Sequence, residues 1–295
     1  QKRLGMPHWR AAWEEKMIKI AFYGKGGIGK STTVTNISVA LAQKGWKVLQ
    51  VGCDPKADST RLLAAGSGSG GAHFSVQDLF SRKEQDPQTV MDWIRTRRPF
   101  GAGDVIREGF AGVLCAETGG PLPGQGCAGR AVITALEKLE EIGVYEKNGP
   151  DAVLFDVLGD VVCGGFAMPM RSGYADAVFI LTSGENMSLF AAANIGQALE
   201  GFRNRGYARL GGLILNRRDV PEEEQKVDAL AECLHTEIVG RLPRSPLVQE
   251  AEETGRCVLE AFPDSPMADR YRALADRIME TVQEADGDKI VPRKG

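Results

Sequence analysis

A glycine-rich segment near the amino end of the chain combines two lysines with hydroxyl side chains. Gly24–Thr32 reads GKGGIGKST, and its first eight residues fit the pattern G-x-x-x-x-G-K-[ST]. An apolar run precedes the segment and a helical pattern follows it, so backbone N–H groups and a helix amino end would face phosphate oxygens. The sequence therefore predicts a nucleotide site in which Lys30 contacts the β- and γ-phosphates and Ser31 binds Mg²⁺. The residues expected around the phosphates are Gly24, Lys25, Gly26, Gly27, Ile28, Gly29, Lys30, Ser31 and Thr32.

Two acidic segments follow two other predicted strands. Asp54–Thr60 reads DPKADST, and Asp156–Asp160 reads DVLGD. Because the carboxyl ends of parallel strands meet at one edge of a sheet, these carboxylates can hold Mg²⁺, directly or through water, and orient an attacking water. A single aspartate in such a place is more often a cap or turn residue. Two such segments beside a phosphate-binding loop favour a role in nucleotide hydrolysis.

Two of the six cysteines lie in glycine-rich settings, Cys127 in GQGCAGR and Cys163 in DVVCGG. Neighbouring glycines let backbone N–H groups approach the sulfurs of an iron–sulfur cluster and help set its reduction potential. Neither cysteine belongs to a C-x-x-C pair, which disfavours a zinc ribbon. A [4Fe–4S] cluster usually takes four thiolates, and two chains related by a two-fold axis would supply them from one interface. The remaining cysteines are predicted to be buried small apolar side chains: Cys53, Cys115, Cys233 and Cys257.

The elements that must position these residues alternate between short apolar runs and helical patterns. This rhythm predicts an α/β fold with a mostly parallel sheet and helices on both faces. The expected strands are Ile18–Tyr23, Lys47–Gly52, Gly112–Ala116, Ala152–Val157, Ala177–Thr182, Leu210–Leu215 and Glu237–Leu242. The expected helices are Ser31–Gln43, Arg130–Ile142, Met187–Phe202, Glu222–Leu234 and Met267–Glu284. We expect one domain over residues 17–284, an amino-terminal extension or tag-like segment over 1–16, and a flexible tail over 285–295.

Composition narrows the classes of protein that fit. The net charge of -3 gives no broad electrostatic case for nucleic acid. No apolar run approaches the roughly 18 residues of a membrane span. The start of the chain lacks the apolar core of a secretory signal. Cysteines placed among such motifs favour metal or redox chemistry over disulfides. We therefore expect a cytoplasmic protein that binds neither nucleic acid nor membrane.

Two resemblances follow from these motifs. The second lysine of the loop, Lys25, resembles that of the deviant Walker A P-loop NTPases, in which it reaches the partner subunit's nucleotide across a dimer interface. The strings GKGGIGKSTT, VGCDPKADSTR, GGPLPGQGCAGR and DVLGDVVCGGFAMP resemble the nitrogenase iron protein family, from about Met17 to about Arg277. The resemblance implies an ATP-hydrolysing oxidoreductase component, a homodimer holding one [4Fe–4S] cluster and two MgATP. Such a dimer takes electrons from ferredoxin or flavodoxin and passes them to a larger two-subunit catalytic partner.

The resemblance also implies roles for particular residues. Cys127 and Cys163 would bind the cluster, and Lys25 would contact phosphate and act in hydrolysis. The acidic segments would be the two nucleotide switches, with Asp160 as the base for water. Asp54 and Asp58 would lie in the first switch, Asp54 acting in hydrolysis and Asp58 near the metal, and Asp156 would begin the second switch. The residues implied around the adenosine are Asn216, Pro243, Arg244, Gln249 and Glu252. Arg130 would act in docking and, in some members, is regulated by ADP-ribosylation.

Several features separate this chain from its possible relatives. Cys127–Arg130 reads CAGR and Pro55–Asp58 reads PKAD, whereas dark-operative chlorophyll-synthesis reductases more often carry CGGY and PKHD. The extension over 1–16, the Gly66–Gly71 insertion and the short end depart from nitrogenase reductases. They suit a nitrogenase-like reductase, for example of methylthio-alkanes or of nickel tetrapyrroles.

Two other classes share the loop. A chromosome- or septum-positioning ATPase lacks such paired cysteines, and its membrane forms end in a basic amphipathic helix, whereas the last predicted helix here mixes acids with arginines. A cluster-assembly scaffold ATPase normally carries C-x-x-C, which this sequence lacks.

Overall fold

The computed structural model describes residues 17–64, 88–121, 126–159, 167–171, 173–202 and 207–287. Within them one sheet has eight strands in the order β3-β4-β2-β5-β1-β6-β7-β8. All neighbouring strands are parallel except β3 and β4. The strands are β1 (Ile18–Tyr23), β2 (Val48–Cys53), β3 (Arg107–Glu108), β4 (Leu114–Glu117), β5 (Ala152–Val157), β6 (Ala177–Thr182), β7 (Arg209–Asn216) and β8 (Ile238–Leu242).

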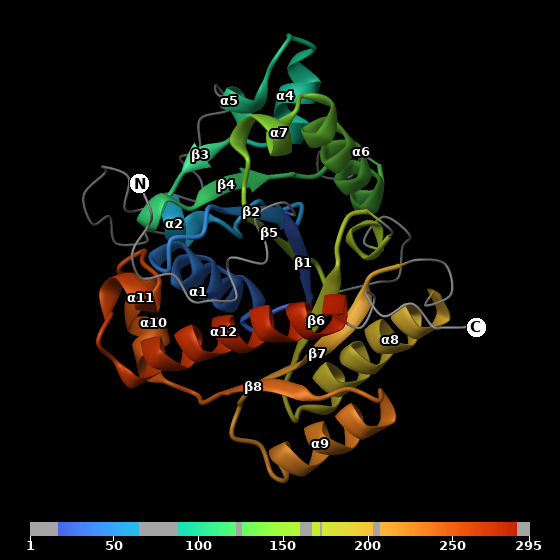
Figure 1. Ribbon diagram of the computed structural model, residues 1–295, viewed down its shortest axis with the longest axis vertical. Helices are drawn as coiled ribbons and strands as arrows, with labels where there is room; N and C mark the ends of the chain where they lie inside the picture. Colours follow the sequence, from blue (N-terminus) through green and yellow to red (C-terminus); the bar gives the residue numbers. More distant parts are fainter. Residues whose placement is uncertain are drawn as a thin grey trace.

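Helices cover both faces of this sheet (Figure 1). One face is covered by α1 (Lys30–Gln43), α2 (Arg61–Ala64), α10 (Pro246–Glu253), α11 (Val258–Ala261) and α12 (Pro266–Gly287). The other is covered by α4 (Val90–Thr96), α5 (Ala102–Val105), α6 (Ala128–Glu141), α7 (Val144–Asn148), α8 (Asn186–Phe202) and α9 (Glu223–Cys233). Two short 3-10 turns, η2 (Phe110–Gly112) and η3 (Met168–Met170), complete the described elements.

Successive side chains of each strand point to opposite faces of the sheet, so the core forms two layers. In β1, Ile20 and Phe22 pack with α1 and α12, whereas Ala21 and Tyr23 pack with the helices of the opposite face. All four side chains are fully buried. Strands covered on both faces must be apolar at every position, which is why they read as continuous apolar runs.

The predicted α/β fold is confirmed, and each of the predicted strands and helices has a counterpart with ends that differ by a few residues. The antiparallel strand β3 was not predicted, because two residues leave no periodicity. Helix α4 was also missed, although Thr89 and Asp92 form a capping box at its start. In the part of the chain that the structure describes, no helix is long and apolar enough to cross a membrane.

A buried amide ties the centre of the sheet to α1 and to the loop that follows β2. Gln50 on β2 is fully buried. Its Nε2 donates to the carbonyl oxygen of Ser59 and to Ser59 Oγ, both at 3.0 Å, and its Oε1 accepts from Ser38 Oγ at 2.9 Å. A single side chain therefore fixes the end of the Asp54–Thr60 segment against the sheet.

Replacing Gln50 with an apolar residue of similar size leaves these partners buried and unsatisfied. We expect Gln50→Leu to lower the free energy of unfolding by about 2–3 kcal/mol in urea denaturation of the nucleotide-free protein. Gln43→Leu makes the same chemical change at an exposed position of α1 and should shift stability by less than about 0.5 kcal/mol. Similar stabilities for the two variants would contradict a structural role for the Gln50 amide.

Candidate functional site

The phosphate-binding loop connects β1 to α1 and leaves an open backbone cradle. Gly29 caps the helix with a φ of 89° in the left-handed region, where a side chain is strained. A Cβ there would also lie 2.6 Å from Asn216 Nδ2. At Gly26 and Gly27, by contrast, a Cβ would meet nothing within 4 Å. The loop thus has free space where side chains at these two positions would lie.

A buried ion pair lies beneath this cradle. Lys30 Nζ, at the start of α1, pairs with Asp156 Oδ1 at the end of β5. Lys30 is 9% exposed and Asp156 1%. The other carboxylate oxygen, Asp156 Oδ2, is buried and has no hydrogen-bond partner among the described residues. An orphaned carboxylate oxygen beside a phosphate loop fits a water or cation that arrives with the nucleotide.

The turn after β7 holds the loop from the other side. Asn216 Nδ2 donates to the carbonyl oxygen of Ile28 and Arg218 Nη2 to that of Gly27, each at 2.6 Å. The buried carboxylate of Glu223 fixes this turn by accepting the backbone N–H of Arg218 at 3.0 Å. Arg218 was missed from the sequence, since nothing in its spacing distinguishes it from a surface arginine. Asn216 lies against the loop, and its contact with adenosine stays a prediction.

The predicted adenosine segment approaches the same helix. Thr32 Oγ1 donates to Glu252 Oε1 on α10 at 2.6 Å, so Glu252 is brought to the first turn of α1. Three other residues predicted to contact adenosine are exposed and lie close to Glu252 in the sequence: Pro243, Arg244 and Gln249. Their contacts with adenosine stay predictions.

The first acidic segment is a tight turn at the end of β2. Asp54 Oδ1 accepts the backbone N–H of Lys56 at 2.9 Å, and Ala57 has a φ of 52°. The pKa of Asp58 is raised, first by burial and then by the neighbouring charge of Asp54. Crowded carboxylates of this kind gain from a bound cation, so the segment fits the predicted place near Mg²⁺.

Glu117 is a further acidic residue at this edge that was missed from the sequence. It ends β4, and its Oε1 accepts from Thr60 N and Thr60 Oγ1, both at 2.7 Å. Burial raises the pKa of Glu117 to about 7, and the hydrogen bonds from Thr60 oppose that shift. Its position at the carboxyl end of a strand, like that of Asp156, is the signal that could have found it.

The cysteines divide into exposed and buried groups. Cys127 is exposed immediately before α6. A cluster shared between two chains needs its ligands at the surface, so Cys127 fits that role. Arg130 is exposed in the first turn of the same helix. Cys163 and Asp160 lie outside the described residues, and their roles stay predictions.

Three of the other cysteines are buried as predicted: Cys53, Cys115 and Cys257. Burial raises the pKa of the Cys115 thiol to about 12 and that of Cys257 to about 11. The prediction was wrong for Cys233, which is exposed. Helix α9 buries Val227 and Ala231, four residues apart on one face, and Cys233 lies on the opposite side of the helix.

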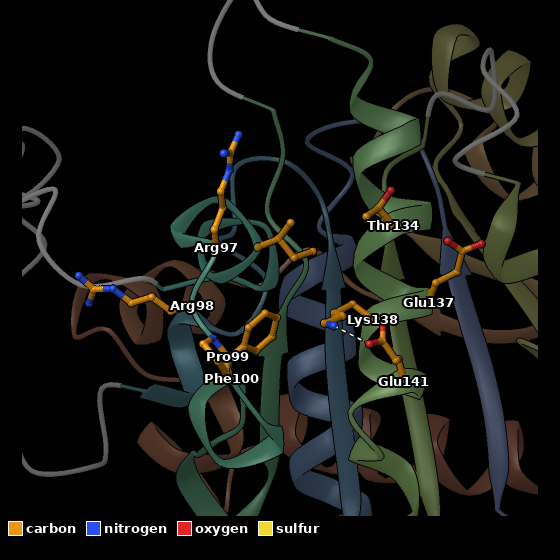
Figure 2. A pocket seen from close by; sticks show the side chains of 9 residues that line it. Arg97, Arg98, Pro99, Phe100, Thr134, Glu137, Lys138 and Glu141 are labelled. Carbon is orange, nitrogen blue, oxygen red and sulfur yellow. Dashed lines mark hydrogen bonds and ion pairs between the residues drawn. The ribbon is translucent and has the colours of Figure 1, made fainter.

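A hollow of about 470 Å³ between α4 and α6 lies elsewhere on the molecule. Figure 2 shows Lys138 extending from α6 toward Phe100, with Arg97 and Arg98 pointing away from it. The Lys138 amine lies 5.5 Å from the centre of the Phe100 ring and pairs with Glu141 at 2.7 Å. None of the lining residues belongs to the phosphate loop or to the acidic segments, so the hollow is separate from the predicted nucleotide site.

The Lys30–Asp156 ion pair should contribute measurably to the stability of the nucleotide-free, cluster-free protein. We expect Lys30→Met to lower the free energy of unfolding by about 3 kcal/mol, because Asp156 is left as a buried unpaired charge. Adding Asp156→Asn should recover most of this loss, and Lys25→Met, in the same loop, should change stability little. Urea denaturation measures all three. A double variant no more stable than the single one would contradict the coupling of the two charges.

The cysteine exposures give a second prediction. In cluster-free protein, an alkylating reagent should modify both Cys127 and Cys233, because both are exposed. Loading the cluster should protect Cys127, since a coordinated thiolate is not available to the reagent, while Cys233 stays reactive as an internal control. Peptide mass spectrometry after a short labelling pulse measures both sites. Equal labelling of Cys127 with and without the cluster would exclude it as a ligand.

The sequence matches a known protein family and proteins of known name. The family described as "4Fe-4S iron sulfur cluster binding proteins, NifH/frxC family" matches residues 18–294. The chain is 44% identical over 266 residues to the nitrogenase iron protein of Methanococcus voltae, covering 90% of this chain and 89% of that protein. It is also 44% identical over 279 residues to the nitrogenase iron protein of Methanospirillum hungatei JF-1, covering 94% and 91%. The resemblance read from the motifs is thereby confirmed.

Solved structures of other proteins share the architecture. The cell division ATPase MinD of Pyrococcus furiosus superposes with a TM-score of 0.60 at 22% identity, covering 90% of this chain and 99% of that chain. A ParA family ATPase from Chlorobium tepidum TLS gives a TM-score of 0.63 at 17% identity, covering 88% and 98%. Similarity at this level of identity establishes the fold and carries no argument about activity.

Proposed function

We infer that this chain, which belongs to the NifH/frxC family of 4Fe-4S iron sulfur cluster binding proteins, is an ATP-hydrolysing oxidoreductase component. It works as a homodimer that binds a [4Fe–4S] cluster between its subunits and MgATP in each. The observation that carries the nucleotide part is the buried Lys30–Asp156 pair beneath the phosphate loop, in which one Asp156 oxygen has no hydrogen-bond partner among the described residues. The exposed Cys127 carries the cluster part.

The nucleotide chemistry follows from the charges at the sheet edge. Lys30 would contact the β- and γ-phosphates of a nucleotide in the loop. Ser31 would help to bind Mg²⁺, and the Asp156 oxygen that has no partner among the described residues lies where it could face the metal or its water. Asp58 would lie near the metal, Asp54 would act in hydrolysis, and Asp160 would accept a proton from the attacking water. Lys25 would reach the nucleotide of the partner subunit, so that hydrolysis depends on the geometry of the dimer.

The cluster, when bound, supplies one-electron chemistry at low potential. Cys127 and Cys163 of each subunit would hold it, close to the surface of the dimer. Arg130, exposed one turn into α6, would contact the protein that receives the electron. We propose that this protein is a larger two-subunit catalytic component of the nitrogenase type, and that ferredoxin or flavodoxin supplies the electrons. The names of the two archaeal relatives favour a nitrogenase over methylthio-alkane or nickel-tetrapyrrole reduction.

The proposal is tested on anaerobically purified protein. We expect a homodimer with about four irons per dimer, because each chain offers two ligand-type cysteines. Lys25→Ala should retain MgATP binding and lower the rate of hydrolysis by roughly 10³-fold. This is the lower limit of the rate enhancement given by a cationic side chain that a partner inserts into a nucleotide site. Lys30→Ala should weaken binding and hydrolysis together. Four irons in a stable monomer, or equal and small effects of the two lysines, would overturn the dimeric mechanism.

A further inference from the structure

The carboxylate of Glu117 on β4 extends over the neighbouring strand β2 and accepts hydrogen bonds from Thr60, the last residue of the Asp54–Thr60 loop. In the sheet, Gly52 on β2 lies opposite Glu117 on one side and Asp156 on the other. A Cβ at Gly52 would overlap Glu117 Oε2. The glutamate can fold over β2 toward Thr60 only because residue 52 has no side chain. It then accepts both the backbone N–H and the hydroxyl of Thr60.

The Glu117 carboxylate depends on Thr60 for the hydrogen bonds that the structure gives it. Glu117 Oε2 is buried and has no hydrogen-bond partner among the described residues. Among the described residues, the hydrogen bonds that stabilise this carboxylate come from Thr60 through Oε1. If Thr60 moves away, a buried carboxylate loses both donors at once, which is costly in an apolar interior. Glu117 must therefore move with Thr60 or find other hydrogen-bond donors for its carboxylate.

A second contact joins the same loop to the residues after β4. A Cβ at Gly120 would overlap Pro55, so the two backbones are packed together without space between them. Arg95 on α4 donates to the carbonyl oxygen of Gly120, and Met91 N–H donates to that of Thr118 at 3.0 Å. The Thr118–Gly120 segment is thus held between α4 and the loop, and a shift of Pro55 must displace it.

The chain leads from this segment to Cys127. Thr118 N–H donates to the carbonyl oxygen of Gly52 at 2.9 Å, which fixes the start of the segment to β2. From Gly120 the chain reaches Cys127 through residues 121–126, of which 122–125 lie outside the described residues. The path begins on the first acidic segment and ends at Cys127, whereas the second acidic segment runs along the chain to Cys163.

We propose that Glu117 is a positioning residue that couples the Asp54–Thr60 loop, through the Thr118–Gly120 segment, to the cluster ligand Cys127. The coupling rests on the proposed function, because it needs a nucleotide at one end and a cluster at the other. A change in the loop on MgATP binding acts on Glu117 through Thr60 and on Gly120 through Pro55. Both contacts then alter the surroundings of Cys127.

Variants of the pair test this coupling in the cluster-loaded homodimer. The measurements are MgATP affinity and the acceleration by MgATP of iron chelation from reduced protein. Thr60→Val removes the hydroxyl donor, and Glu117→Gln removes the charge but keeps an acceptor. We expect both to bind MgATP within about threefold of the native affinity. We expect both to lose roughly tenfold of the MgATP acceleration, the scale of one hydrogen bond to a charged group.

Two conservative variants serve as controls. Thr60→Ser keeps the hydroxyl and should rescue the acceleration, and Glu108→Gln neutralises an exposed glutamate on the adjacent strand β3 and should behave as the native protein. A loss in Thr60→Val that Thr60→Ser does not rescue would indicate a packing effect and overturn the hydrogen-bond coupling. Native acceleration in both Thr60→Val and Glu117→Gln would overturn it as well.

Hydrogen–deuterium exchange on the native homodimer decides the question even if a variant fails to assemble its cluster. MgATP should change exchange in Gly24–Ser31, in Asp54–Thr60 and in Thr118–Gly120. A response in the first two segments without one in Thr118–Gly120 would overturn the coupling and leave the nucleotide function standing. No response in Gly24–Ser31 would instead overturn the proposed function.

Discussion

The arrangement of the nucleotide edge depends on the buried ion pair between Lys30 and Asp156. It joins the first residue of α1 to the end of β5, and both side chains are nearly inaccessible to water. Neither charge is tolerated alone in such a place. A phosphate that attracted Lys30 would therefore leave Asp156 in need of a cation. If nucleotide binds as proposed, the pair would couple the binding of phosphate to the binding of Mg²⁺.

The order of the strands concentrates acidic groups around that pair. The strands β4, β2 and β5 are neighbours, and Glu117, Asp54 and Asp156 lie at or just beyond their carboxyl ends. Burial raises the pKa values of Glu117 and Asp58, and nearby carboxylates add to the effect. The charge of Lys56 opposes the rise in the pKa of Asp58, and the hydrogen bonds from Thr60 oppose the rise in that of Glu117. Lys30 pairs with the third carboxylate, Asp156.

Much of this architecture is visible in the sequence, for physical reasons. Buried parallel strands must be apolar throughout, and the phosphate loop needs glycines and a lysine at fixed spacing. Glu117 was missed because its importance depends on the strand order, which brings β4 beside β2 although other elements separate them in the sequence. Cys233 was misplaced because residue type alone does not indicate which face of a helix is buried. Arg218 acts on a backbone carbonyl oxygen, and such a contact leaves no pattern in the sequence.

The hydrogen bond between Thr32 and Glu252 has a consequence for the molecule as a whole. The first turn of α1 and the last turn of α10 come from opposite ends of the chain, and β5 and β7 supply residues between them. A ligand held by such a set binds only when nearly the entire chain is folded. Its binding energy is therefore added to global stability, by about 2.7 kcal/mol at a free concentration one hundred times the Kd. Nucleotide bound at the proposed site would therefore protect the whole chain against unfolding and proteolysis.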